Sequence, residues 1–412
     1  VLAANQRHQE LLAAYGKLVP AVSATASYTR NQYQVEVNIP AFSATGMPTG
    51  ASTTAVISPQ DQLDAVFSLS VPLIDAGAWQ RIGSAGTTAA AAGERAAAAG
   101  LEVQKSVART YFQYIAAAAL VAAAEQAGAA AEQNEQLVRR RRDSGLASDL
   151  DVARASADSE RTRQSLADAE LTRELAARSL QTLTGLWPSG AVPPLGSPLT
   201  AEAELPRWQG GVATLPQVRA AALEQRAAEQ SARATWLAYV PTVTGTLSER
   251  LTNAAGFGQP ATWSAGLSLA WRADLATLYS ARALQTAGAL SQVRSERAQR
   301  DAEDQIFNAW SQTRAYLVRS RAARAQRESA QLAATLSHRR YAAGTATQLE
   351  VIQAERDAFA AEVARIQADA DLAYSRVLLR LSAGQPPDEL ELAAPAGRPP
   401  AATLPADRAG AS

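Results

Sequence analysis

The sequence predicts a mainly α-helical fold with a small β part, built from a duplicated unit of two strands and a long helical hairpin. Three observations predict it. The segment RRRRDSGLASDLDVARA at 139–155 resembles HRRYAAGTATQLEVIQAE at 338–355. Each has a basic run, then a turn of small residues with one glycine, then an acidic helix start. A long proline-free helical stretch precedes each copy, and short alternating strands precede each stretch. An ordered repeat of this kind indicates duplication of one structural unit.

Alanine dominates the composition, and the charges balance. The chain has 39 Lys and Arg against 39 Asp and Glu, with 6% aromatics and no cysteine. Zero net charge argues against a nucleic-acid partner. The lack of cysteine excludes disulfides and thiol chemistry. No uninterrupted apolar run reaches the roughly 18 residues of a transmembrane helix. The chain opens at Val1 within a helical pattern, and we expect that a leader preceded it.

The first unit is predicted to cover residues 1–185. Its expected elements are a helix at 1–19, strands at about 20–36 and 62–74, and a helical hairpin at 76–185. The helix from about 76 to 142 would extend roughly 100 Å at 1.5 Å per residue. A narrow, alanine-rich stripe on so long a helix requires packing partners along its whole length.

The second unit is predicted to cover residues 214–382 in the same order. Its expected elements are a helix at 214–239, strands at about 240–252 and 262–273, and a hairpin at 276–382. A proline- and glycine-rich linker at 186–213 joins the units, and the tail at 383–412 is expected to be disordered. Loops rich in Pro, Gly, Ser and Thr are expected at about 38–60 and 253–261.

The strands alternate apolar side chains with small polar ones. The apolar positions are Phe67, Leu69, Val71, Trp263, Leu267, Leu269 and Trp271. Alternation is typical of a half-buried strand in a soluble sheet, and equally of a membrane β-barrel strand with its apolar face toward lipid. Four strands cannot close a membrane barrel, so several chains would have to contribute.

The two corners contain the residues that end one helix and start the next. Gly145 and Gly344 suit the left-handed position after a helix. Ser148 is a candidate N-cap, and Thr347 with Glu350 forms a capping box. Local helix-hairpin chemistry therefore accounts for both corners without any further function.

These features resemble the TolC-type outer membrane efflux protein family, from the N-terminal helix to about residue 382. The resemblance rests on the strand starts YGKLVPAVS and LAYVPTVT, the strand end LSVPLIDAG, and the two corners. It implies a homotrimer that forms a 12-stranded transmembrane β-barrel joined to a long periplasmic α-helical barrel. It also implies an exit duct in the outer membrane for drugs, toxic solutes or proteins. The implied partners are outer-membrane lipid, a periplasmic adaptor and an inner-membrane pump.

The resemblance also assigns roles to residues. The corners would form the periplasmic mouth, with Tyr341 of the second hairpin bonding Asp151 of the first. Glu350 stands at the first position of the family's acidic ring, whereas Gln353 replaces the second aspartate and Ala346 replaces a latch arginine. Adaptor contacts would fall on the hairpin tips, at Ser144, Gly145, Leu146, Ala343, Gly344 and Thr345. The apolar strand positions would face lipid.

Two other classes of protein remain open from the sequence. A periplasmic adaptor also carries a helical hairpin, but it has one hairpin and more strand than the four segments found here. A soluble alanine-rich coiled-coil scaffold would account for the helices but not for the alternating strands. His8 and His338 fit solvated helix positions, and no catalytic, metal or cofactor motif is present. We therefore expect no enzyme and no cofactor.

Overall fold

The computed structural model describes the chain except residues 1, 43–46, 190–191, 197 and 387–412. It divides into two compact units. One contains residues 1–96 and 219–298, and the other contains residues 97–218 and 299–412. The long helices α2 (Ala76–Asp143) and α6 (Leu275–Ala342) each contribute to both units.

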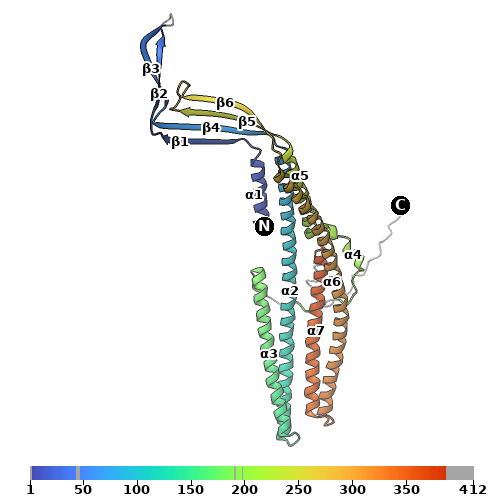
Figure 1. Cartoon of the computed structure of the whole chain (residues 1–412). Helices are drawn as coiled ribbons and strands as arrows, with labels where there is room; N and C mark the ends of the chain where they lie inside the picture. The colour runs from blue at the N-terminus through green and yellow to red at the C-terminus, as the bar shows by residue number, and fades with distance from the viewer. Residues whose placement is uncertain (1, 43–46, 190–191, 197, 387–412) are drawn as a thin grey trace, which may run out of the picture. The chain divides into compact units, whose positions relative to one another are not determined.

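The first unit contains a four-stranded antiparallel sheet in the order β1-β4-β5-β6 (Figure 1). Its strands are β1 (Ala21–Arg30), β4 (Asp61–Ile74), β5 (Thr242–Thr252) and β6 (Ala261–Ala270). The predicted last strand, 262–273, is wrong at its end, because β6 stops before Trp271. The Trp271 indole N–H instead donates to the Tyr239 carbonyl at 3.1 Å.

The register places small hydroxyl side chains on one face and apolar side chains on the other. Ser23 pairs with Ser68, Ser68 with Ser248, and Ser248 with Ser264. The hydroxyls of the outer two pairs lie 2.7 and 2.9 Å apart. One residue along, the row Val22, Leu69, Leu247 and Ala265 occupies the opposite face, because side chains alternate along a strand.

A second sheet corrects the sequence prediction. Strands β2 (Val35–Phe42) and β3 (Pro48–Ser58) form an antiparallel hairpin where a loop was expected at 38–60. The predicted strand 20–36 is wrong in its second half, because β1 ends at Arg30 and β2 begins only at Val35. Between them the Asn31 backbone N–H donates to the Gln60 carbonyl at 2.7 Å. The described chain thus has six strands and not four. Prolines are tolerated here because both strands of a two-stranded hairpin are edge strands.

Helices of the first unit pack through small and polar side chains. They include α1 (Leu2–Gly16) and α5 (Pro216–Trp236), which is followed by a 3-10 turn at Leu237–Tyr239. The Ser84 hydroxyl of α2 donates to the Ala227 carbonyl of α5 at 2.9 Å, and Thr87 Oγ1 donates to Gln230 at 2.8 Å. Alanine and serine allow two helix backbones to approach closely.

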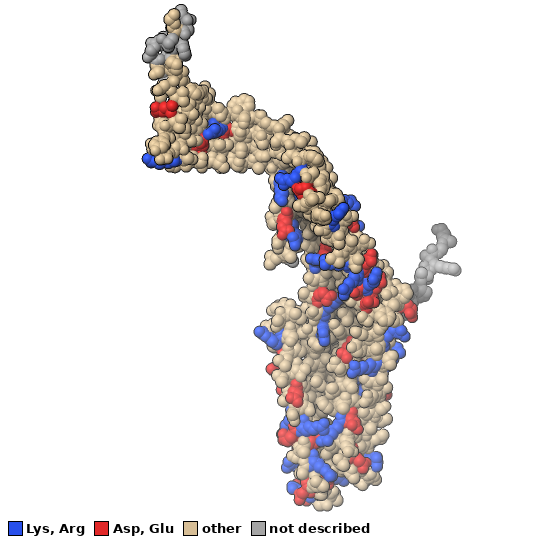
Figure 2. All heavy atoms as spheres, viewed as in Figure 1, with Lys and Arg blue, Asp and Glu red and all other residues tan. Residues whose placement is uncertain are grey.

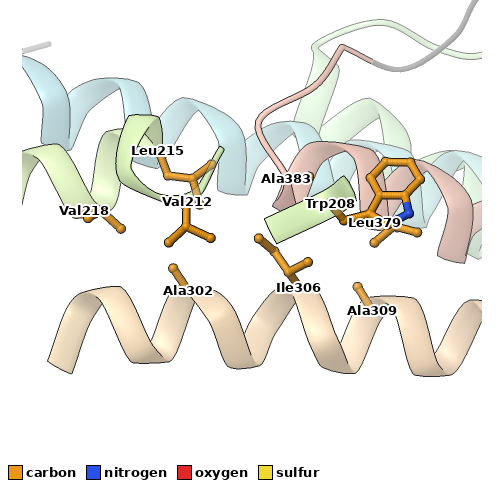
Figure 3. Packing of buried hydrophobic residues seen from close by; sticks show 9 residues of the cluster. All are labelled: Trp208, Val212, Leu215, Val218, Ala302, Ile306, Ala309, Leu379 and Ala383. Carbon is orange, nitrogen blue, oxygen red and sulfur yellow. The ribbon is translucent and has the colours of Figure 1, made fainter. Parts of the chain in front are cut away.

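The second unit contains the two helical hairpins and the connector between the repeats. Its further helices are α3 (Asp149–Thr184), α4 (Leu205–Gln209), a 3-10 turn at Val212–Thr214 and α7 (Gln348–Ser382). In its largest apolar cluster Val212 of the connector points toward Ala302 and Ile306 of α6, and Trp208 lies beside Leu379 of α7 (Figure 3).

Hydrogen bonds fix the connector against the second hairpin. The indole N–H groups of Trp208 and Trp310 both donate to the Ala203 carbonyl, at 3.2 and 3.0 Å. The Arg376 side chain, 2% exposed, donates to the Thr200 carbonyl at 2.7 Å and pairs with Glu202 at 2.9 Å. These bonds satisfy backbone carbonyls that an irregular segment would otherwise bury unpaired.

Two expectations concern other parts of the chain. Most of the predicted tail, from residue 387 onward, lies outside the described residues. Helix α2 contains an 18-residue window of mean hydropathy 1.3, a third of which is buried. Such a window tolerates up to two charged residues, so it does not conflict with the expectation that no uninterrupted apolar run reaches about 18 residues. Alanine supplies this hydropathy, and one such window is weak support for a spanning helix.

Candidate functional site

The first candidate site is the pair of corners that end the two hairpins. At the first corner Gly145 has φ +76°. Its N–H donates to the Arg142 carbonyl and the Leu146 N–H donates to the Arg141 carbonyl, both at 2.8 Å. This pair of bonds is the Schellman ending of a helix. Ser148 then caps α3 in a capping box with Asp151, as the predicted N-cap requires.

The second corner repeats this geometry. Gly344 has φ +74°. Its N–H donates to the Tyr341 carbonyl at 3.0 Å, and the Thr345 N–H donates to the Arg340 carbonyl at 2.9 Å. Thr347 and Glu350 form the capping box of α7, which confirms the predicted one. Both corners are built from the same local bonds, so the two hairpins end in the same way.

The tips beyond these bonds are exposed to solvent. Leu146 is 71% exposed, and the neighbouring tip residues Ser144, Ala343 and Thr345 are also exposed. A Cβ added at Gly145 or at Gly344 would meet no atom within 4 Å. The glycines are therefore required by their positive φ and not by crowding.

Just above the tips, an apolar cluster joins the first hairpin to the second. Val138 of α2 and Ala155 of α3 pack with Tyr341 of α6 and Val351 of α7, all of them buried. The Arg141 guanidinium lies 4.6 Å from the centroid of the Tyr341 ring, and its Nη1 donates to the Tyr341 carbonyl at 3.0 Å. Burial raises the pKa of the Tyr341 phenol, while the Arg141 charge opposes that rise. Sequence reasoning did not assign Arg141 this role.

The other expected mouth residues are placed by the capping boxes. Asp151 Oδ2 accepts from the Ser148 backbone N–H and hydroxyl at 3.1 and 2.7 Å. Among the described contacts, Tyr341 bonds Arg141 and not Asp151. Glu350 Oε1 accepts from Thr347, and its Oε2 lies 3.8 Å from Arg340. Gln353 is exposed on α7.

A polar group lies about a turn further from the tips. Arg356 of α7 donates through Nε to Asp158 of α3 at 2.9 Å, and the Asp158 side chain is 5% exposed. His338 Nε2 of α6 lies 2.7 Å from Glu355 Oε1 of α7. These residues line a groove of about 650 Å³ between the two hairpins. The expectation that His338 is a solvated position holds in part, because its side chain is 43% exposed while its ring is also paired with a largely buried carboxylate.

The second candidate site is the two-faced sheet. On the apolar face Phe67 is 49%, Trp263 76%, Leu267 76% and Leu269 69% exposed. Leu69 and Val71 lie on the same face and are half-buried. Charged atoms are sparse over the sheet and frequent over the helices in the view of Figure 2. An exposed apolar face of this extent marks a surface that contacts lipid or another protein.

Comparison with known proteins decides the family. The model of the outer membrane efflux protein family matches residues 2–186 and 213–385. The chain belongs to the outer membrane efflux protein family. The two matched ranges correspond to the two repeats, and the gap between them falls in the connector.

Solved structures of outer-membrane channels share the fold of this efflux protein. The Vibrio cholerae outer membrane protein VceC is similar with TM-score 0.74 at 16% identity, covering 93% of this chain and 92% of that one. The open-state Neisseria gonorrhoeae MtrE channel has TM-score 0.72 at 21% identity, covering 93% and 84%. The Campylobacter jejuni CmeC channel has TM-score 0.73 at 16% identity, covering 93% and 81%. No curated protein sequence matches the chain.

Proposed function

We propose that three copies of this chain form an exit duct of the outer membrane, through which an inner-membrane pump and a periplasmic adaptor expel drugs, toxic solutes or proteins. The duct is passive, and the pump supplies the energy. On this proposal the four-stranded sheets lie in the outer membrane and the helical hairpins lie in the periplasm.

The observation that carries the proposal is the sheet. It has a hydroxyl face, an exposed apolar face, and β1 and β6 as its edges. Open edges expose backbone groups that cannot remain unpaired in lipid. Pairing β6 of one copy with β1 of the next satisfies them, and three copies give twelve strands. The apolar face then meets lipid and the serine rows line the lumen.

We further propose that the corners form the regulated mouth of the duct. Tyr341, Asp151, Glu350 and Gln353 lie on the part of each hairpin that the trimer would bring together. Glu350 contributes one carboxylate per chain where the resemblance implies two, so we propose a mouth that weakly attracts cations. The exposed tips are proposed to contact the adaptor.

The proposal is tested by separating conduction from coupling to the adaptor. Leu146→Asp combined with Thr345→Asp places charges on both tips without touching the capping boxes. We expect normal single-channel conductance of the purified double variant in planar bilayers. In cells lacking the wild-type chain, we expect the variant to fail to lower ethidium accumulation.

Gln136→Asp, which adds a charge at an exposed position of α2 away from the tips, is the matched control and should restore ethidium efflux fully. Wild-type protein that gives no conductance steps in the bilayer would contradict the duct. Conductance together with normal efflux in the tip variant would retain the duct and remove the proposed adaptor contact.

A further inference from the structure

We propose that joining the two hairpins beside the corners is linked to the uptake of one proton by Glu355, the buried carboxylate paired with His338. The joined arrangement would then tighten in mildly acid conditions and loosen as the pH rises. This inference rests on the proposed function only in identifying the joined hairpins with the closed mouth. The proton linkage itself belongs to the protein whether or not it conducts.

The geometry sets the pair directly beside the contact between the hairpins. His338 and Glu355 belong to the second hairpin, at a separation of 2.7 Å. The next residue, Arg356, reaches across to Asp158 of the first hairpin with its Nε and Nη2, both at 2.9 Å. A charge on Glu355 therefore interacts electrostatically with the Arg356–Asp158 ion pair that joins the hairpins.

The charges of the two carboxylates and the guanidinium in this group do not balance. Asp158 and Glu355 are two carboxylates against the single guanidinium of Arg356. The Glu355 side chain is 16% exposed, and its Oε2 is buried without a hydrogen-bond partner. An unpaired charge of this kind is costly away from water. One proton on Glu355 restores the balance between these carboxylates and the guanidinium.

The remaining groups around the groove do not supply the missing charge. The groove-lining side chains of α2 are uncharged, namely alanines and Gln126. Apart from His338, those of α6 are also uncharged and include Gln331 and Thr335. Arg161 of α3 lines the groove but is exposed, so water screens it. Glu362 of α7 already pairs with Arg365 and Arg327, at 2.7 and 3.0 Å.

The direction of the linkage follows from the carboxyl group. Burial raises the pKa of Glu355 above its ordinary value of 4.5, Asp158 adds to the rise, and His338 opposes it. The joined form therefore holds a proton that the separated form releases more readily. Its added stability is complete below the ordinary value and is lost as the pH rises through the raised value.

Hydrogen exchange of the full-length protein in detergent tests the inference. Exchange is followed in peptides covering residues 149–165 and 348–363 at about pH 5, close to the ordinary value of a glutamate, and at about pH 7.5, well above it. Rates are divided by the intrinsic rate at each pH. We expect slower corrected exchange at the acid pH, by about tenfold for each pKa unit gained on joining. His338→Gln with Glu355→Gln should abolish the difference.

The chain supplies its own control. His8 is the other histidine of the sequence and is exposed on α1. His8→Gln should keep the full pH response. Equal corrected exchange of the wild-type protein at both pH values, or faster exchange at acid pH, would overturn the inference, as would a double variant that keeps the response. Bilayer conductance of the same sample tests the duct separately.

Discussion

At the scale of the residue, Arg141 explains how the first hairpin holds the second. The resemblance placed a tyrosine–aspartate bond here and assigned the missing arginine to position 346, where the chain has alanine. The structure supplies an arginine from the opposite hairpin instead. Arg141 covers the Tyr341 ring and bonds its carbonyl at 3.0 Å. That carbonyl also accepts from Gly344, so the arginine contacts the turn itself.

We predict that Arg141→Gln loosens the joined hairpins. A partly desolvated cation over an aromatic ring contributes about 1–2 kcal/mol, which the amide cannot replace. The corrected exchange of peptides around Tyr341 should accelerate, and single-channel conductance should rise. Arg140→Gln, one residue away on the exposed side, should change neither property. Unchanged exchange in Arg141→Gln would show that the apolar cluster alone joins the hairpins.

At the scale of the element, the sheet shows how one strand serves two environments. Residues 267 and 268 are neighbours in β6, yet Leu267 is on the apolar face and Ser268 is on the hydroxyl face. The pleat alone separates them. The helices follow a different rule, since small side chains and single hydrogen bonds position them, as between Ser84 and Ala227.

We predict that Leu267→Arg prevents assembly in the outer membrane, whereas Ser268→Arg is tolerated. An arginine on the lipid face near the middle of the membrane costs about 2–4 kcal/mol per chain, and a trimer multiplies this cost. The yield of protein in the outer-membrane fraction should fall for the first variant and stay near wild type for the second. Equal yields would contradict the assignment of the faces.

At the scale of the whole molecule, a single copy of the chain leaves both edges of its four-stranded sheet unpaired among the described residues. Its four-stranded sheet ends in the edges β1 and β6, and an open edge in lipid has no water to bond its backbone groups. The exposed apolar residues of the same sheet require covering as well. On the proposed function, association of identical copies edge to edge pairs these edges, cyclic closure leaves no edge, and lipid covers the apolar residues.

We predict a trimer in detergent. Light scattering with the detergent contribution removed should give a protein mass of about 130 kDa, three times the 43.2 kDa of one chain. A detergent-free particle of one or two chains would instead favour the soluble scaffold. Because the chain has no cysteine, cysteines placed on β1 and β6 can then identify the edges that meet.

The sequence by itself determined the features that depend on a few neighbouring residues. The glycine ends at 145 and 344, the caps at Ser148 and Thr347, and the alternation around Leu267 all follow from local backbone chemistry, and the repeat fixed their order. The tertiary structure decided which distant side chains meet. Arg141 with Tyr341, and Arg356 with Asp158, depend on how each helix is rotated against its neighbour, which no local pattern specifies. The β2–β3 hairpin was not predicted because its composition is typical of loops. Its strands form through pairing between residues that are distant in the sequence, which a local pattern does not specify.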